Sequence, residues 1–269
     1  MVEFSFFTKP WPKAKTEELI SLTKQFGCDG IELPVRHGFP FEPANAQKKL
    51  PEIVASFAEH GLKVCRVAGE PSPTLFSACA KAGISFIRTM YLSEAKTPYP
   101  EAEASIRKSI ERFLPLCEEY GIQVGIQQHF MSIASQSFIL FQLVKDYPPA
   151  YLSAVWDAAH SGLASEDPRQ ALSIFREHLG LVNFKNAFYH RTTGPESSAN
   201  YLPYFTTGTQ GLCSWEHAVE FLVKKGYKNS ICLHMEYSDE PNVEVYGKRD
   251  VSYLKELFTK YGREANVKP

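Results

Sequence analysis

The 269-residue sequence lacks several features that define common classes of protein. Lys and Arg number 29 against 30 Asp and Glu, so there is no basic excess of the kind that a general nucleic-acid-binding protein carries. No apolar run approaches the ~18 residues of a membrane-spanning helix. The N-terminal segment has neither the basic start nor the long apolar stretch of a signal peptide. We therefore predict a soluble, cytoplasmic protein with no nucleic-acid or membrane partner.

The six cysteines form no Cys-x-x-Cys pair, so zinc ribbons and thioredoxin-like chemistry are not indicated. Most of them lie in apolar runs, as Cys65 does after Val64 and as Cys232 does before Leu233. Buried, reduced thiols in a cytosolic protein are the simplest interpretation.

One unit recurs along the chain: an amphipathic helix, a glycine and a short apolar strand. The glycines suit the left-handed conformation that terminates a helix; they are Gly27, Gly61, Gly83, Gly121, Gly180 and Gly226. The predicted strands span 2–7, 29–33, 62–67, 84–90, 122–127, 151–156, 181–185 and 230–236. The predicted helices span 16–26, 45–60, 72–82, 101–120, 134–147, 168–179, 214–225 and 250–261. Eight such units in ~250 residues predict an α/β fold, a single (β/α)8 TIM barrel over 1–262, followed by a polar tail at 263–269.

The predicted connections are asymmetric. Helix-to-strand links are short, whereas strand-to-helix links at 8–15, 34–46 and 186–213 are long and polar. In a barrel the long links meet at the C-terminal face, where active sites lie. The 186–213 link is the longest, and we expect a structureless lid or binding loop there.

Polar side chains gather at the C-terminal ends of the predicted strands, while the opposite ends carry mainly glycine and aliphatic residues. Each polar residue also has an ordinary structural explanation. Asp157 would cap a turn with Lys185 as its ion-pair partner, and Arg66 and Arg88 would belong to polar layers neutralised by Glu32. The asymmetry of the whole set is not required by a purely structural barrel, so it favours a functional site at this face.

Five stretches at these strand ends resemble the xylose-isomerase-like TIM barrels, the sugar phosphate isomerase/epimerase superfamily, and the resemblance covers essentially the whole chain. The stretches are Gly30–Leu33, Gly121–His129, Val155–His160, Val182–Asn186 and Leu233–Glu236. The resemblance implies a divalent metal ion, often manganese, held by one residue from each of strands five to eight. The corresponding positions here are Gln127, Asp157, Asn183 and Glu236. Gln and Asn replace a Glu and a His, so the chain is similar to a subgroup with an altered centre.

These replacements change the expected chemistry. Amide oxygens suit magnesium or manganese better than zinc, and the loss of a carboxylate weakens binding, so a weakly held ion and no ion both stay open. Gln127 cannot ionise, which leaves Glu236 as the candidate base. The partner proton would come from Glu70, His129, His160 or water, and Lys185 with Lys9 would stabilise an enediolate if no metal is bound. The residues expected to contact substrate are Lys9, Trp11, Glu32, Arg36, Arg66, Arg88 and His160, with the arginines facing a phosphate or carboxylate.

Three functions are compatible with this set of residues. The first is an isomerase or epimerase acting on a small sugar or keto-sugar, and the second is a polyol or sugar-acid dehydratase. The third is a non-catalytic sugar-binding barrel. DNA-repair endonucleases of the same barrel are disfavoured, since they need a three-zinc ligand pattern and a basic DNA face that this sequence lacks. A homo-oligomer is compatible with the resemblance.

Overall fold

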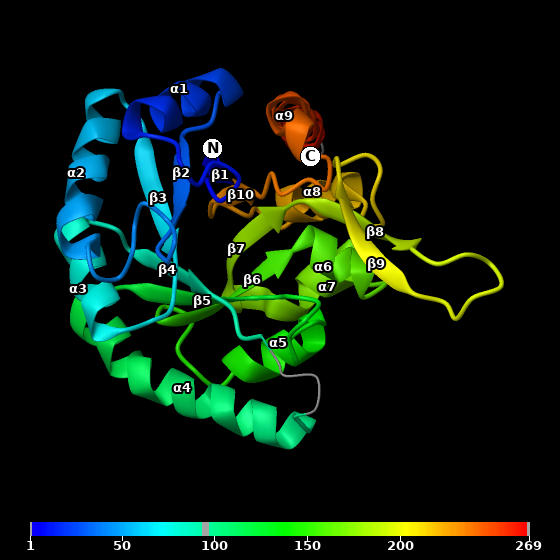
Figure 1. Ribbon diagram of the computed structural model, residues 1–269, viewed down its shortest axis with the longest axis horizontal. Coiled ribbons are helices and arrows are strands. Elements are labelled where there is room, and N and C mark those ends of the chain that lie inside the picture. The colour runs from blue at the N-terminus through cyan, green and yellow to red at the C-terminus, as the bar shows by residue number, and fades with distance from the viewer. Residues whose placement is uncertain (1, 93–96, 268–269) are drawn as a thin grey trace.

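Eight parallel strands close into a barrel in the computed structural model, which describes residues 2–92 and 97–267 (Figure 1). The order around the barrel is β1-β10-β7-β6-β5-β4-β3-β2, which confirms the predicted (β/α)8 TIM barrel. The strands are β1 (Phe4–Phe7), β2 (Gly30–Pro34), β3 (Lys63–Ala68), β4 (Phe86–Thr89), β5 (Gln123–Gln127), β6 (Leu152–Asp157), β7 (Leu179–Phe184) and β10 (Ile231–Leu233).

Helices follow the strands and cover the outside of the barrel (Figure 1). They are α1 (Thr16–Phe26), α2 (Ala46–Glu59), α3 (Pro73–Ala82), α4 (Tyr99–Tyr120), α5 (Ser137–Val144), α6 (Ala158–Leu163), α7 (Pro168–Phe175), α8 (Trp215–Lys224) and α9 (Val243–Val267), with short turns η1 (Arg176–His178) and η2 (Glu240–Asn242). Helix α9 begins before the predicted 250–261 span and continues past 262. The end of the predicted tail, 268–269, lies outside the described residues. No helix in the described ranges combines the length and apolar character needed to cross a bilayer.

Five of the six predicted glycine stops are confirmed, and the sixth is wrong. Gly27, for example, has φ 65° and ends α1. Gly180 instead lies within β7, where a Cβ atom would come 2.2 Å from Ser153 Oγ on β6. It serves close strand packing, and the preceding helix stops at Arg176, which itself has φ 52°.

The expectation of a structureless 186–213 loop is also wrong. This segment forms an antiparallel hairpin of β8 (Asn186–Arg191) and β9 (Tyr201–Thr206). Phe188 and Tyr204 stand opposite each other with ring centroids 5.3 Å apart, a cross-strand aromatic pair that stabilises the hairpin. Figure 1 shows the hairpin extending from the barrel as an arm, with its base beside β7 and α6.

The barrel interior combines a small apolar cluster with buried charge. Phe7, Ala68, Val155, Leu181 and Cys232 form the cluster, which is separate from the larger core between strands and helices. Several charged side chains project into the same interior and are almost fully buried, namely Glu32, Arg66, Arg88, Asp157 and Lys185. Since an unpaired buried charge is costly, each of these groups needs a partner of opposite charge or a hydrogen-bonding group nearby.

Candidate active site

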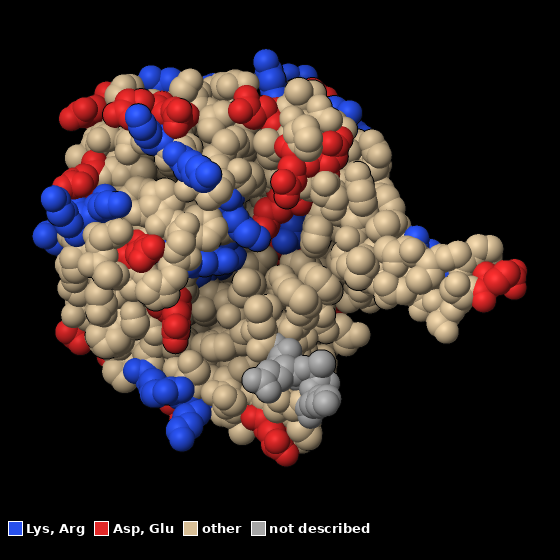
Figure 2. All heavy atoms as spheres, in the orientation of Figure 1, with Lys and Arg blue, Asp and Glu red and all other residues tan. Residues whose placement is uncertain are grey.

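A cavity of about 610 Å³ opens at the C-terminal ends of the strands. Figure 2 shows basic and acidic side chains gathered around a hollow near the middle of this face. Seven of the predicted site residues line the cavity, namely Lys9, Arg36, Arg88, Gln127, His129, Lys185 and Glu236. The strand-end asymmetry in the sequence therefore does correspond to a single concave site.

Glu236, which follows β10, stands among basic side chains in this cavity. Its carboxylate forms an ion pair with Lys9, and its Oε2 lies 3.5 Å from Lys185 Nζ and 3.4 Å from His234 Nδ1. Burial alone would raise its pKa, but Lys185, His234 and Lys9 together hold the pKa of Glu236 well below its ordinary value. Glu236 is therefore a carboxylate at neutral pH.

Lys185 joins Glu236 to the buried Asp157. Its ammonium nitrogen lies 3.7 Å from Asp157 Oδ2, and its side chain is 6% exposed. Asp157 also accepts hydrogen bonds from the backbone N–H groups of Ala159 and His160, at 3.1 and 3.3 Å, and so caps α6. Burial opposes ionisation of Asp157, but Lys185 and the other partners hold its pKa below the ordinary value. Asp157 thus caps a helix and pairs with Lys185, as the structural explanation from the sequence described.

Arg88 holds the opposite side of the site. Its guanidinium donates to Glu32 on β2 and to Gln127 Oε1 on β5, while Gln127 Nε2 donates to Asp157 Oδ2 at 2.7 Å. Burial opposes ionisation of Glu32, yet Arg88 holds its pKa below the ordinary value. The arginine is thus fixed as a cation between two interior oxygens.

His234 closes these contacts into a ring. Its Nε2 lies 3.7 Å from Glu32 Oε2, and its Nδ1 faces Glu236. In order, the ring consists of Glu32, Arg88, Gln127, Asp157, Lys185, Glu236 and His234. The sequence analysis did not select His234 as a site residue. The spacing along the strand could have indicated it. Cys232, His234 and Glu236 alternate with the apolar Leu233 and Met235, so their side chains face the same side of the strand.

The four predicted metal ligands do not fit a divalent ion in this arrangement. The Gln127 oxygen that would face the ion accepts a hydrogen bond from Arg88. The space between Asp157 and Glu236 holds the ammonium group of Lys185. Asn183 is buried beside Asp157 in the strand register, and its side-chain amide has no hydrogen-bond partner among the described residues. Protein cations therefore already contact three of the four predicted ligands, Gln127, Asp157 and Glu236.

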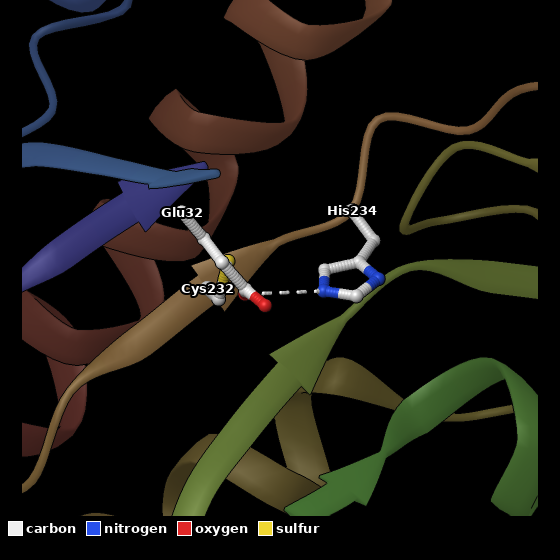
Figure 3. A group of neighbouring side chains, drawn as sticks. All are labelled: Glu32, Cys232 and His234. Carbon is white, nitrogen blue, oxygen red and sulfur yellow. Dashed lines mark hydrogen bonds and ion pairs between the residues drawn. The ribbon is translucent and has the colours of Figure 1, made fainter. Parts of the chain in front are cut away.

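A different group of side chains could hold a metal ion. Glu32, Cys232 and His234 each offer one ligand atom, and these atoms lie within 4.8 Å of one another. Figure 3 shows the three side chains pointing toward one another across β2 and β10. Burial and the neighbouring Glu32 raise the pKa of Cys232 well above its ordinary value, so the thiol is protonated and donates to Glu32 at 3.1 Å. A zinc-like ion would have to displace that proton.

His129 lines the cavity beside the ring. Burial lowers its pKa to about 4, with a contribution from Lys185, so the imidazole is neutral near pH 7. Its Nδ1 accepts a hydrogen bond from the Met131 N–H at 3.3 Å, which assigns the proton to Nε2. His160 is fully buried behind it, with ring centroids 4.2 Å apart, and does not line the cavity.

Besides His160, three other predicted substrate or acid residues lie away from the cavity. Arg66 donates to Ser5 Oγ at 2.7 Å and lines a second cavity at the N-terminal ends of the strands, because its side chain points down the barrel interior. Trp11 packs against the rings of Phe6 and Phe26 on the outer side of β1. Glu70 is exposed beyond β3 and is not among the cavity residues. These positions give no support to substrate contact by Arg66 or Trp11 or to proton transfer by Glu70.

The closed barrel and its polar C-terminal cavity define an enzyme-like (β/α)8 protein. A family model described as Xylose isomerase-like TIM barrel matches residues 73–257 of the chain. The protein therefore belongs to the xylose isomerase-like TIM barrel family. A sequence search of curated proteins finds no match.

Solved structures with the same fold are similar over nearly the whole chain. A D-psicose 3-epimerase crystallised in the presence of D-fructose has a TM-score of 0.72 at 13% identity, covering 96% of this chain and 99% of its own. The probable 3-DHS dehydratase AsbF from Bacillus anthracis gives 0.71 at 13% identity, with 94% and 99% covered. The IOLI protein with a zinc atom gives 0.73 at 11% identity, with 98% and 99% covered. At these identities the likeness establishes the fold alone.

Proposed function

We propose that the protein is an isomerase or epimerase that moves a proton beside the carbonyl group of a small sugar or keto-sugar. The observation that carries this proposal is the ionised Glu236 in the cavity wall, with the Lys185 ammonium 3.5 Å away. A carboxylate that removes a proton and a cation that receives the resulting oxyanion are the two parts that enolisation needs. The fold similarity to epimerases and to a dehydratase supports this class of chemistry.

The charges of the ring indicate how the step proceeds. The cations that keep Glu236 ionised also make it a weak base, because they stabilise its charged form. When Glu236 takes the proton, its negative charge moves to the substrate oxygen. Lys185, which was paired with the Glu236 carboxylate, then pairs with the negative oxygen of the enediolate. No metal ion is assigned to the step, because Lys185 and Arg88 contact three of the four expected ligands, Asp157, Glu236 and Gln127.

Glu236 and Glu240 are the two carboxylates among the described cavity residues, and Glu240 is exposed on η2. A single half-buried carboxylate favours a one-base transfer, in which Glu236 returns the proton to the neighbouring carbon. Neutral His129, with its proton on Nε2, is positioned in the cavity to hydrogen-bond a substrate hydroxyl.

A dehydratase is the second candidate, and the same His129 observation favours it. β-Elimination needs a base for the proton beside the carbonyl and a proton for the departing hydroxyl, which leaves as water. Glu236 would take the first proton and deliver it to the leaving oxygen, while neutral His129 donates a hydrogen bond to that oxygen.

Exchange of substrate protons with solvent tests both candidates. A panel of ketoses, aldoses and sugar acids is incubated with the protein in D2O, and proton NMR follows loss of the signal beside the carbonyl. We expect exchange with at least one compound, abolished by Glu236→Gln and retained in the matched control Glu244→Gln, an exposed position on α9 outside the cavity. Formation of an unsaturated product would identify the dehydratase, whereas binding without exchange or conversion would identify a non-catalytic sugar-binding barrel.

A further inference from the structure

Among the described residues, the charged side chains in and behind the cavity wall contact one another, except for Arg36 and the exposed Glu240 on η2. Three carboxylates and three cations at its inner end are in contact with one another, namely Glu32, Asp157 and Glu236 with Arg88, Lys185 and Lys9. Each of these cations has a carboxylate partner. Arg36 also lines the cavity and adds a fourth positive charge to this group.

Arg36, which follows β2, has no partner for its guanidinium. The group lies over the Phe7 ring, with its central carbon 5.8 Å from the ring centroid, and makes no hydrogen bond or ion pair with the described residues. Glu42, a carboxylate in the same loop, has other partners, because it accepts from the Gly38 N–H at 3.0 Å and lies 3.4 Å from His37 Nδ1. The Arg36 guanidinium therefore lies at the cavity wall with no carboxylate in direct contact among the described residues.

This position is unfavourable for an empty site. Arg36 is half-buried, and burial together with the nearby positive Arg88 lowers its pKa, although Glu236 and Glu32 act in the opposite direction. The Phe7 ring lies beside both arginines, with the central carbon of Arg88 at 4.6 Å and that of Arg36 at 5.8 Å, so it separates the two guanidinium groups from the apolar interior. An anionic ligand group would relieve both the desolvation and the repulsion.

We propose that Arg36 forms a subsite for a carboxylate group on the substrate, so that the enzyme acts on a sugar acid rather than on a neutral sugar. This inference rests on the proposed function, since it names the substrate class of the same cavity. One free guanidinium matches one negative charge and can pair with a carboxylate through two parallel hydrogen bonds. A phosphate dianion would bring a second charge, for which the balanced ring offers no free cation. Arg66 cannot share this role, because it points to the other end of the barrel.

Matched pairs of ligands test the subsite by isothermal titration calorimetry. D-Fructuronate and D-fructose share a keto-sugar chain and differ in carrying a carboxylate or a hydroxymethyl group at C6, as do D-tagaturonate and D-tagatose. D-Fructose 6-phosphate supplies the phosphate alternative. The proteins are the wild type, Arg36→Gln, Arg36→Lys and Lys48→Gln. The last removes one positive charge from an exposed position on α2 outside the cavity.

We expect the wild type to bind at least one acid about tenfold or more tightly than its neutral partner, as a charge-assisted hydrogen bond allows. Arg36→Gln should abolish the preference, Arg36→Lys should keep part of it, and Lys48→Gln should keep all of it. Absence of acid binding, equal affinity within each pair, a preference that survives Arg36→Gln, or tighter binding of the phosphate would each overturn the subsite. Deuterium exchange separates this result from the proposed function: acid binding without exchange contradicts the enzyme alone, and exchange without acid preference contradicts the subsite alone.

Discussion

The ammonium nitrogen of Lys185 lies 3.5 Å from Glu236 Oε2, at the place where the family resemblance implies a metal ion. The same nitrogen is 3.7 Å from Asp157 Oδ2. Lys185 therefore supplies the positive charge that two facing carboxylates require, and the site is built around a protein cation.

Replacing Lys185 tests this arrangement through stability. Lys185→Met leaves Asp157 and Glu236 facing each other without their shared cation, and we expect the free energy of unfolding to fall by about 3 kcal/mol. Urea denaturation at neutral pH measures the change. Lys224→Met is the matched control, because Lys224 is exposed and its pair with Glu220 lies on the surface, where the loss is at most about 1 kcal/mol. Equal losses in the two variants would show that Lys185 has no special role in the interior.

The same replacement should impair catalysis. Removing the cation that receives the enediolate charge is expected to lower the rate of solvent exchange on the order of 100-fold, as loss of one oxyanion donor does in other enzymes. NMR exchange rates are compared at a pH where the variant is folded. A Lys185→Met protein that exchanges at the wild-type rate would remove Lys185 from the mechanism.

Metal removal should have no effect on the reaction. Because Lys185 and Arg88 contact three of the four expected ligands, we predict that dialysis against EDTA changes the exchange rate by less than about twofold. A tenfold change would correspond to ~1.4 kcal/mol in the barrier. Added manganese or magnesium should restore nothing. Loss of activity with EDTA and recovery with manganese would reinstate the metal-assisted mechanism.

Asp250 gives a pH dependence of stability that is independent of the active-site ring. Burial raises its pKa to about 6, although it accepts hydrogen bonds from the Gly208 N–H and the Tyr237 hydroxyl. A carboxyl group whose pKa is higher in the folded state binds its proton more tightly there, so its protonation favours folding. The contribution is fully present below the unfolded pKa of ~3.9 and is lost as pH rises through 6.

Asp250→Asn removes this titration. Between pH 4 and 7 the wild type should therefore lose roughly 1 to 3 kcal/mol of stability relative to Asp250→Asn. Chemical denaturation of both proteins at several pH values gives the difference curve. A flat difference, or one of opposite slope, would contradict the assignment of a raised pKa.

Gly180 tests the corrected view of β7. A methyl group there would meet Ser153 Oγ at 2.2 Å on the neighbouring strand, so Gly180→Ala is expected to destabilise the barrel by about 2 kcal/mol through overpacking. Gly194 is the control, since a Cβ there meets nothing within 4 Å and its replacement should change stability by less than about 0.5 kcal/mol. Thermal unfolding of the two variants would refute the packing role if their midpoints agreed.

The fold was predictable because its signals are local and repeated. Alternating apolar strands and amphipathic helices, separated by glycines such as Gly27 and Gly121, specify parallel pairing and barrel closure. The position of the site followed from the same periodicity, which places Gln127, Asp157 and Glu236 at one end of the barrel. The hairpin was not predicted because its stability comes from cross-strand pairs such as Phe188 with Tyr204. The residue pattern of one strand does not show which strand it pairs with.

The sequence indicated some partners within the site and not others. The contacts of Lys185 with Asp157 and of Arg88 with Glu32 were offered there as structural explanations, and both form. Arg66 and Arg88 lie on adjacent strands, but the register partner of Arg88 is Ala68, two residues beyond Arg66. Arg66 therefore lies nearer the N-terminal end of the barrel and points to Ser5, whereas Arg88 donates to Glu32 and Gln127. Which way a long side chain turns depends on its neighbours across the barrel. A position near the end of a strand therefore predicts that a side chain can reach the barrel interior, but it does not predict which residue that side chain contacts.

A crystal structure of the protein soaked in manganese chloride, with anomalous scattering to locate the ion, would show whether a metal ion or Lys185 lies between Asp157 and Glu236. We expect no anomalous peak there, and density for the Lys185 ammonium in contact with both carboxylates. A manganese peak coordinated by Gln127, Asp157, Asn183 and Glu236, with Lys185 turned away, would contradict this expectation.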